Sequence, residues 1–203
     1  KIVIVTAEHA GKVEEVRDKC PTLEHLIIIG EEREGWTCKE IASAAASDKF
    51  DRSMAPPTKA KDQMLIYFTS GTTSMPKMVA RDHSYGLAHT ITCNYWQGLR
   101  RDDIHWTLTD TGWAKAAWGI IFPPIIAGAA IMLYDAAGFD AEMHLKLIEK
   151  YQVTTFCAPP TVYRLFAQMD VSGHDLSSIR HCIGAGEPLN PEAMRSWKAA
   201  TGC

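Results

Sequence analysis

The stretch Tyr67–Val79, YFTSGTTSMPKMV, places a turn of hydroxylated residues and one glycine between an apolar run and a single lysine. Backbone N–H groups and hydroxyls in such a turn donate hydrogen bonds, and Lys77 adds a positive charge. These properties are typical of a phosphate-binding loop. The alternative is a polar surface turn, which the Ser, Thr and Gly content alone would also favour.

The spacing within this stretch excludes a Walker A loop. That motif requires G-x-x-x-x-G-K-[ST]. Here Pro76 occupies the position of the second glycine, and Met78 occupies the position of the hydroxyl that binds magnesium. Any phosphate chemistry at this loop therefore belongs to a different class of protein.

On both sides of the loop, short runs rich in β-branched residues alternate with longer helical patterns. We expect helices near residues 11–20, 37–46, 78–95, 113 onward, 141–151, 160–169 and 191–200. We expect strands in KIVIVT, HLIIIG, MLIYFT, DIHWTLT, AIMLYD, VTTFCA and IRHCIGAG. This alternation predicts an α/β fold with doubly wound, largely parallel sheets and flanking helices. Ligands of such sheets bind at the carboxyl ends of strands, which selects the loops 69–77, 110–113 and 184–189.

The chain organisation predicts two subdomains. Residues 1–50 have the pattern of the end of one α/β subdomain, residues 51–63 form a polar linker, and residues 64–203 form a second α/β subdomain. The first residue is Lys1 instead of Met, and the last helical pattern stops close to Cys203. We therefore expect this sequence to be a piece of a longer protein, called the parent below.

Composition limits the partners. The 203 residues are 46% hydrophobic and carry a formal net charge of −3, which gives no reason to expect nucleic acid or an anionic membrane surface. The uncharged segment 116–134 approaches the length of a membrane span, but Pro123-Pro124 and Gly128 divide it into a helix, a turn and a strand. The cysteines lack zinc spacing and are interpreted as reduced thiols, at positions 20, 38, 93, 157, 182 and 203. We expect a cytoplasmic protein, or one of the mitochondrial matrix in a eukaryotic cell.

Several stretches in the same order resemble one enzyme family. TSGTTSMPK fits eight of the nine positions of T-S-G-[ST]-[TS]-G-x-P-K, the phosphate loop of the adenylate-forming superfamily. WTLTDTGWAKAAWG is similar to the segment of acyl-CoA synthetases that borders the acyl pocket, and GAGEPLNPE resembles the loop along the adenine of bound ATP. APPTVYR is also similar to this subgroup. The resemblance covers nearly the whole chain, with medium-chain acyl-CoA synthetases as the nearest subgroup, and implies part of the large N-terminal domain.

The resemblance implies a two-step reaction with ATP, Mg²⁺ and coenzyme A. A carboxylate, expected to be a medium-chain fatty acid, attacks the α-phosphorus of Mg·ATP, and coenzyme A then displaces AMP. Neither step needs a protein nucleophile, so catalysis depends on positioning and on stabilising phosphate charge. Lys77 and Thr72 are the expected catalytic residues, and no protein metal ligands are expected. The implied phosphate-binding residues are Thr69, Ser70, Gly71, Thr72, Thr73, Ser74, Met75, Pro76 and Lys77.

The other implied site residues have alternative interpretations. Gly186, Glu187 and Pro188 are the adenine-side residues, although the Glu187 side chain could instead serve as an N-terminal charge for the helix after Pro191. Trp113 is the implied acyl-pocket residue, and a buried core tryptophan is the alternative. His83 and His105 are interpreted as structural histidines.

Ser74 departs from the family pattern, which has glycine at this position. A Cβ there strains the backbone if its φ is positive, whereas at negative φ the hydroxyl would assist the phosphate site.

The resemblance also implies parts that this sequence lacks. The Tyr-Gly-x-Thr-Glu motif, the ribose-binding aspartate, the hinge and the lid with its catalytic lysine would follow Cys203. We therefore expect no complete adenylation by this chain alone. The alternatives are an adenylation domain of a peptide synthetase, a luciferase-like enzyme, or a nucleotide-binding module without catalysis.

Overall fold

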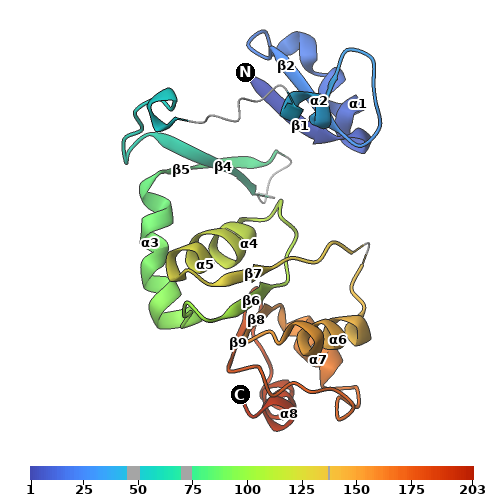
Figure 1. The fold of residues 1–203 in the computed structure, drawn as a ribbon. Coiled ribbons are helices and arrows are strands. Elements are labelled where there is room, and N and C mark those ends of the chain that lie inside the picture. Colours follow the sequence, from blue (N-terminus) through green and yellow to red (C-terminus); the bar gives the residue numbers. More distant parts are fainter. Residues whose placement is uncertain (45–50, 70–74, 137) are drawn as a thin grey trace. The chain divides into compact units, whose positions relative to one another are not determined.

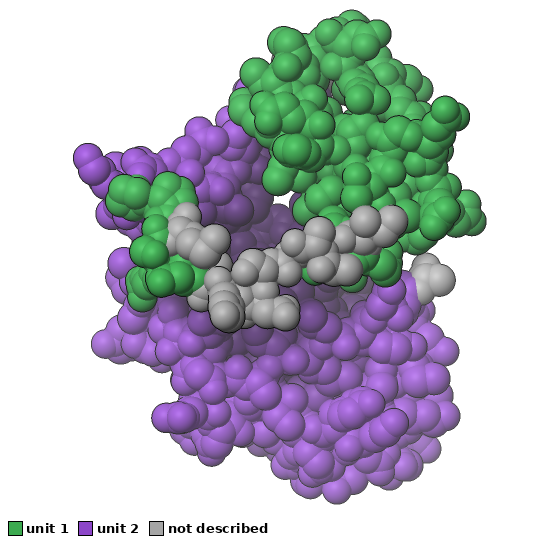
Figure 2. Space-filling view, turned by 45° about the horizontal axis from the view of Figure 1, so that its top comes forward, with its two compact units in different colours: residues 1–57 green, residues 58–203 purple. Residues whose placement is uncertain are grey.

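A computed structural model of the chain describes residues 1–44, 51–69, 75–136 and 138–203. The chain divides into two compact units, residues 1–57 and 58–203 (Figure 2). The division falls within the polar stretch 51–63. All six cysteines are free thiols, and none of the described helices is long and apolar enough to cross a membrane.

The first unit contains a three-stranded parallel sheet in the order β1-β2-β3, of which Figure 1 labels β1 and β2. Its core includes Ala10 and Ile28, both fully buried. The helix expected over residues 37–46 begins later than predicted, because Thr37 and Cys38 pair with β2 as a short strand. The elements are β1 (Ile2–Thr6), α1 (Ala10–Glu14), β2 (His25–Ile29), β3 (Thr37–Cys38) and α2 (Lys39–Ala44).

The second unit opens with an antiparallel hairpin of β4 (Gln63–Thr69) and β5 (Lys77–Asp82). The predicted helix over residues 78–95 is therefore wrong in its first part. Helix α3 (Ser84–Thr92) begins only after Asp82, whose Oδ1 accepts a hydrogen bond from the Ser84 backbone N–H at 3.1 Å. Residues 77–82 pair along β4 instead, with Thr69 opposite Lys77. The phosphate-loop stretch is thus a hairpin connection, not a strand-to-helix connection.

A four-stranded parallel sheet in the order β7-β6-β8-β9 forms the centre of the second unit. Its strands are β6 (Ile104–Thr107), β7 (Ala130–Met132), β8 (Thr155–Ala158) and β9 (His181–Gly184). The connecting helices are α4 (Ala114–Ala116), α5 (Phe122–Ala127), α6 (Ala141–Tyr151), α7 (Pro160–Phe166) and α8 (Pro191–Thr201). Two π-helical turns, Cys93–Gln97 and Ala117–Ile121, continue α3 and α4. The α/β fold with largely parallel sheets is therefore confirmed.

One sequence expectation within this unit needs correction. Pro123 and Pro124 were expected to break the chain into a turn, but they lie buried in the first turn of α5. Proline is tolerated there because the first N–H groups of a helix have no intrahelical acceptor.

The two faces of this sheet differ in chemistry because successive side chains of a strand point to opposite faces. Trp106 and Phe156 belong to the main apolar core, together with residues of α6, α7 and α8. His105, Thr107 and Cys157 alternate with them, and Thr107 contacts the π turn after α4. Figure 1 shows α4 and α5 on one side of the sheet and α6 and α7 on the other.

Candidate active site

A cavity of about 850 Å³ lies at the carboxyl ends of β6, β7 and β8. The strand order explains its position. The chain leaves β6 toward β7 on one side, whereas it leaves β8 toward β9 on the other side, so the two connections diverge. This divergence makes the ends of β6 and β8 a topological switch point, where open α/β sheets bind their ligands.

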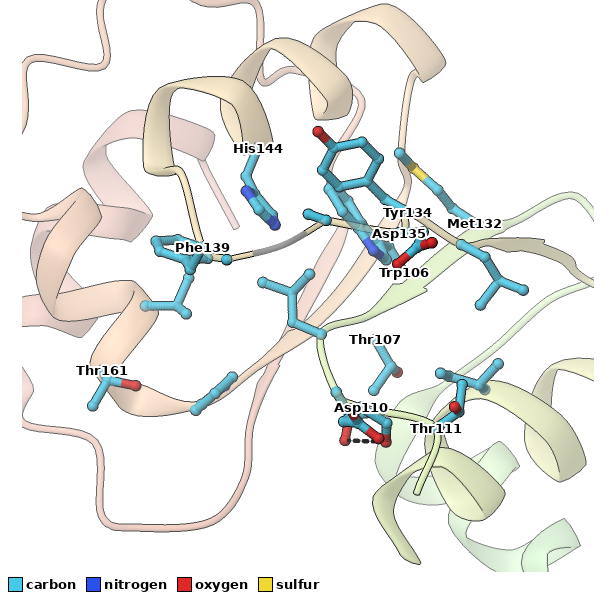
Figure 3. Close-up of a pocket in the computed structure, with 18 of the residues that line it drawn as sticks. Trp106, Thr107, Asp110, Thr111, Met132, Tyr134, Asp135, Phe139, His144 and Thr161 are labelled. Atoms are coloured by element: carbon cyan, nitrogen blue, oxygen red, sulfur yellow. Dashed lines mark hydrogen bonds between the residues drawn. The ribbon is translucent and has the colours of Figure 1, made fainter. Parts of the chain in front are cut away.

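The cavity lining combines apolar side chains with threonine, aspartate and histidine side chains, so it offers both an apolar surface and hydrogen-bonding groups to a small molecule. Figure 3 shows Asp110 and Thr111 on the loop after β6, and His144 across the cavity on α6. The His144 ring stacks on Trp106 at 5.1 Å between centroids, and its Nδ1 donates to the Asp140 carbonyl at 2.5 Å. The remaining lining includes Met132, Tyr134, Asp135, Phe139, Thr161 and Leu165.

The turn after β6 is fixed by its own hydrogen bonds. Asp110 Oδ1 accepts from the Gly112 N–H at 2.6 Å, and the Asp110 carbonyl accepts from the Trp113 N–H at 3.2 Å. Aspartate favours such turns because its side chain bonds the backbone two residues on. The turn therefore presents Asp110 to the cavity and starts α4 directly after Trp113.

Trp113 itself is 71% exposed, so its interpretation as a buried core residue is wrong. Its ring does not belong to the cavity lining, although Asp110 and Thr111 of the same turn do. The assignment of Trp113 to an acyl pocket stays a prediction.

A buried hydrogen-bond chain fixes the helix that follows this turn. Thr107 Oγ1 donates to the Gly119 carbonyl at 3.0 Å, so it must accept from His105 Nε2 at 2.9 Å. His105 Nδ1 then accepts from the Thr155 hydroxyl at 2.7 Å. Burial lowers the pKa of His105 to about 4, so the ring is neutral near pH 7. The interpretation of His105 as structural is confirmed.

The hairpin between β4 and β5 contains the expected phosphate loop. Of its predicted site residues, Thr69, Met75, Pro76 and Lys77 are described, and all four are exposed. Lys77 forms no ion pair with any residue that the structure describes. An exposed lysine at the base of a hairpin is available to a bound anion. The other predicted positions lie outside the described residues: Ser70, Gly71, Thr72, Thr73 and Ser74.

The loop after β9 is exposed at Gly186, Glu187 and Pro188. Gly186 has a φ of +117°, which only glycine adopts easily. The Glu187 carboxylate accepts from Arg164 of α7 at 3.1 Å, while Asn190 caps α8 by accepting from the Ala193 N–H. Asn190, not Glu187, therefore caps α8, and the interpretation of Glu187 as an N-terminal charge for this helix stays a prediction. The role of the Gly186–Pro188 backbone beside adenine stays a prediction.

Sequence reasoning missed several residues that shape this site. His144, Asp135 and Phe139 line the cavity but carry no recognisable motif. Away from the cavity, at the amino ends of β6 and β9, buried Asp103 forms an ion pair with the partly exposed Arg180, 77 residues later, and Thr154 Oγ1 donates to Asp103 at 2.7 Å. No local pattern predicts such a long-range pair. Asp82 and Ser84, in contrast, carried a readable helix-start signal.

The fold and the cavity together define an α/β domain with a ligand site at the carboxyl edge of a parallel sheet. A family model described as AMP-binding enzyme matches residues 1–203. The chain therefore belongs to the AMP-binding family of adenylate-forming enzymes, which confirms the resemblance.

Named relatives and solved structures agree with this assignment. The mitochondrial acyl-coenzyme A synthetase ACSM3 of Rattus norvegicus is 38% identical over 205 residues, covering 100% of this chain and 35% of that protein. The mitochondrial acyl-coenzyme A synthetase ACSM4 of Homo sapiens is 37% identical over 204 residues, covering 100% of this chain and 35% of that protein. The chain thus spans about a third of the length of these relatives.

The structure of the anthranilate CoA ligase AuaEII in complex with anthranoyl-AMP has a TM-score of 0.86 at 30% identity. That match covers 99% of this chain and 39% of AuaEII. The structure of a Brucella canis acyl-CoA synthetase has a TM-score of 0.84 at 31% identity. That match covers 100% of this chain and 36% of the Brucella canis chain.

Proposed function

We propose that the parent is an acyl-CoA synthetase that activates a medium-chain carboxylic acid with Mg·ATP and transfers it to coenzyme A. The observation that carries this proposal is the 850 Å³ cavity at the switch point, beside the Asp110–Trp113 turn, in a chain of the AMP-binding family. Relatives named as acyl-CoA synthetases favour this activity over a peptide-synthetase adenylation domain or a luciferase-like enzyme.

In this proposal, the acid lies at the carboxyl ends of β6 and β8. The apolar wall formed by Trp106, Phe139 and Leu165 suits a hydrocarbon chain. One carboxylate oxygen attacks the α-phosphorus, and the bond from that phosphorus to the oxygen bridging to the β-phosphate breaks. Pyrophosphate leaves, and the mixed anhydride acyl-AMP remains.

Lys77 and the hydroxyls of the hairpin loop would bind the triphosphate. The lysine supplies positive charge toward the β- and γ-phosphates, where charge accumulates as pyrophosphate leaves. Mg²⁺ enters as part of Mg·ATP, so its ligands are chiefly phosphate oxygens and water. In the second step the thiol of coenzyme A attacks the acyl carbon, loses its proton, and AMP leaves.

Pyrophosphate release tests this function. The parent is incubated with Mg·ATP and straight-chain acids of graded length, and the acyl-AMP and acyl-CoA products are identified by mass spectrometry. We expect pyrophosphate release that depends on the acid and acyl-CoA that forms only with coenzyme A present. A folded parent that binds ATP but releases no pyrophosphate with any acid would support the alternative of a non-catalytic nucleotide-binding module.

The proposed cellular location is based on the same relatives. The named synthetases are described as mitochondrial, and we extend this location to the parent as part of the proposal. Fractionation of cells that express a tagged parent tests it.

A further inference from the structure

Two adjacent prolines interrupt the backbone hydrogen bonding of the helical segment that follows the Asp110–Trp113 turn. Helix α5 continues directly from the π turn Ala117–Ile121, and Pro123 and Pro124 lie in the first turn of α5. A proline has no N–H group, so neither residue can donate a hydrogen bond to a carbonyl of the preceding turn. Some carbonyl groups of the π turn therefore need donors from elsewhere in the molecule.

The carbonyl of Trp118 receives its hydrogen bond from a distant side chain. The Phe122 N–H, which would be its donor in an α-helix, instead bonds the Ala117 carbonyl five residues back, in the π register. The donor for Trp118 in the π register would be Pro123, which has no N–H. Gln97, which is only 1% exposed, donates from Nε2 to the Trp118 carbonyl at 2.6 Å. The amide of Gln97 thus supplies the donor that Pro123 lacks.

The carbonyl of Gly119 is bonded in the same way from the sheet. The residues four and five positions after Gly119 are Pro123 and Pro124, so neither the α nor the π register provides a backbone donor. Thr107 Oγ1 donates to this carbonyl at 3.0 Å, and Thr107 also lines the cavity (Figure 3). Both side-chain bonds matter because a buried carbonyl left without a donor loses its hydration and gains nothing in return.

The end of α3 contacts the same helical segment at further points. Gln97 is the last residue of the π turn Cys93–Gln97, and Cys93 Sγ donates to the Pro123 carbonyl at 3.3 Å. The rings of Trp96 and Trp118 lie 5.3 Å apart between centroids. The π turn that ends α3 therefore holds the π turn that follows α4.

The π turn after α4 places Ile120 in the wall of the cavity. Ile120 is buried and lines the cavity together with Thr107. Each residue of a helix turns the chain by about 100°, so a change from the π to the α register would rotate Ile120 relative to the Asp110–Trp113 turn. Isolated π turns within α-helices are frequent at functional sites. The bonds to the Trp118 and Gly119 carbonyls thus maintain the register that directs Ile120 to the cavity.

We propose that Gln97 and Thr107 are positioning residues of the acid site. Their side chains replace the backbone donors that Pro123 and Pro124 lack, and so hold the π turn that places Ile120 in the cavity wall. This inference rests on the proposed function, because that function assigns the acid to this cavity. If Gln97 only filled space, an apolar side chain of the same length would serve equally well, and its effect would not depend on Pro123.

A double-mutant cycle in the parent tests the link between Gln97 and Pro123. Gln97→Met keeps the length of the side chain and removes the donor, and Pro123→Ala restores an N–H five residues after Trp118. Ser178→Ala is the matched control, because Ser178 Oγ donates to the Val153 carbonyl at 2.9 Å, just before the amino end of β8. Urea denaturation gives the midpoint of each variant. Gln97→Leu and Pro123→Val replace any variant that does not fold.

We expect Gln97→Met to lower the urea midpoint of the parent. In the Pro123→Ala background the same substitution should lower the midpoint by less than half as much, because the restored N–H can bond the Trp118 carbonyl. Ser178→Ala should lower the midpoint equally in both backgrounds. A Gln97→Met loss of the same size in both backgrounds would overturn the proposal.

Steady-state kinetics of pyrophosphate release, with octanoate as the acid, tests the positioning role. We expect Gln97→Met to raise KM for octanoate about fivefold, the effect of losing one net hydrogen bond, and to leave KM for ATP unchanged. Adding Pro123→Ala to Gln97→Met should reverse part of this rise, and Ser178→Ala should leave both KM values unchanged. An unchanged KM for octanoate in a folded Gln97→Met parent, or an equal rise of both KM values, would contradict the positioning role.

The two measurements separate this inference from the proposed function, because the unfolding cycle requires no turnover. If no acid supports pyrophosphate release but the cycle shows coupling, the proposed activity fails, and the replacement of the missing donor by Gln97 stands without its link to an acid. If octanoate is activated but neither the cycle nor KM responds to Gln97→Met, the proposed function stands and this inference fails.

Discussion

The close approach of Gly119 to β6 predicts that Gly119→Ala destabilises the second unit. An ideal Cβ at this position lies 2.6 Å from Thr107 Cγ2 and 2.8 Å from Thr107 Oγ1. The optimal separation of two carbon atoms is about 3.5–4.0 Å, so the overlap is about 1 Å. Thr107 cannot rotate away easily, because its hydroxyl bonds both Gly119 and His105.

The magnitude follows from two opposing effects. Overpacking a rigid core costs about 1–3 kcal/mol, and the fixed Thr107 places this site near the upper limit. Alanine is favoured over glycine in a helix by about 1 kcal/mol, which offsets part of the loss. The net free energy of unfolding should therefore fall by about 2 kcal/mol.

Urea denaturation followed by tryptophan fluorescence measures this change, since Trp106 and Trp197 are buried in the core of the second unit. Gly173→Ala is the matched control, because nothing lies within 4 Å of its added Cβ, and it should change stability by less than about 0.5 kcal/mol. Thr107→Ser, which removes Cγ2 and keeps the hydroxyl, should restore part of the stability in the Gly119→Ala background. A Gly119→Ala chain as stable as the unmodified chain would refute the close packing of α4 on β6.

Three further predictions concern charge and the ligand site. Asp103→Asn should lower the free energy of unfolding by about 3 kcal/mol, the lower part of the range for breaking a buried pair, because the Arg180 side chain keeps 28% exposure. Burial alone would raise the pKa of Asp103. Hydrogen bonds from Arg180, Thr154 and the Arg100 N–H outweigh this effect, so the pKa of Asp103 lies below its ordinary value. The stability from this pair is therefore fully present above the unfolded pKa of about 4 and is lost as pH falls from there through the folded pKa. In urea titrations, Asp103→Asn should show a weaker loss of stability than the unmodified chain between about pH 5 and pH 2. Lys77→Ala in the parent should reduce kcat/KM for ATP by about 1.5–3 kcal/mol, whereas an unchanged value would remove Lys77 from the site. Trp113→Gly should shift the acid preference toward longer or bulkier chains with a stability change below about 0.5 kcal/mol, because the ring is 71% exposed; a uniform loss on every acid would contradict the pocket role.

The parallel sheets could be predicted from sequence because β-branched runs and helical patterns alternate at regular intervals. The hairpin could not, since residues 77–82 become a strand only by pairing with β4. The residue pattern alone predicted that the following helix begins at residue 78. The Asp82 side chain, which bonds the Ser84 N–H, was the local signal that the helix starts later.

The candidate site was predictable only as far as its loops. The Asp110–Trp113 turn could be located because it follows a strand and carries turn residues, and Asp110 does line the cavity. The opposite wall depends on how α6 and α7 pack, so His144 and Phe139 could not be selected from sequence.

Acid-dependent formation of acyl-AMP by the parent tests the central claim most directly. Purified parent, Mg·ATP and a carboxylic acid are mixed without coenzyme A, and the enzyme-bound products are identified by mass spectrometry. We predict acyl-AMP together with an equal amount of pyrophosphate, and conversion of the acyl-AMP to acyl-CoA when coenzyme A is added. ATP consumption that yields ADP and phosphate, or no acyl-AMP with any mono- or dicarboxylic acid, would contradict the assignment of this chain to an acyl-CoA synthetase.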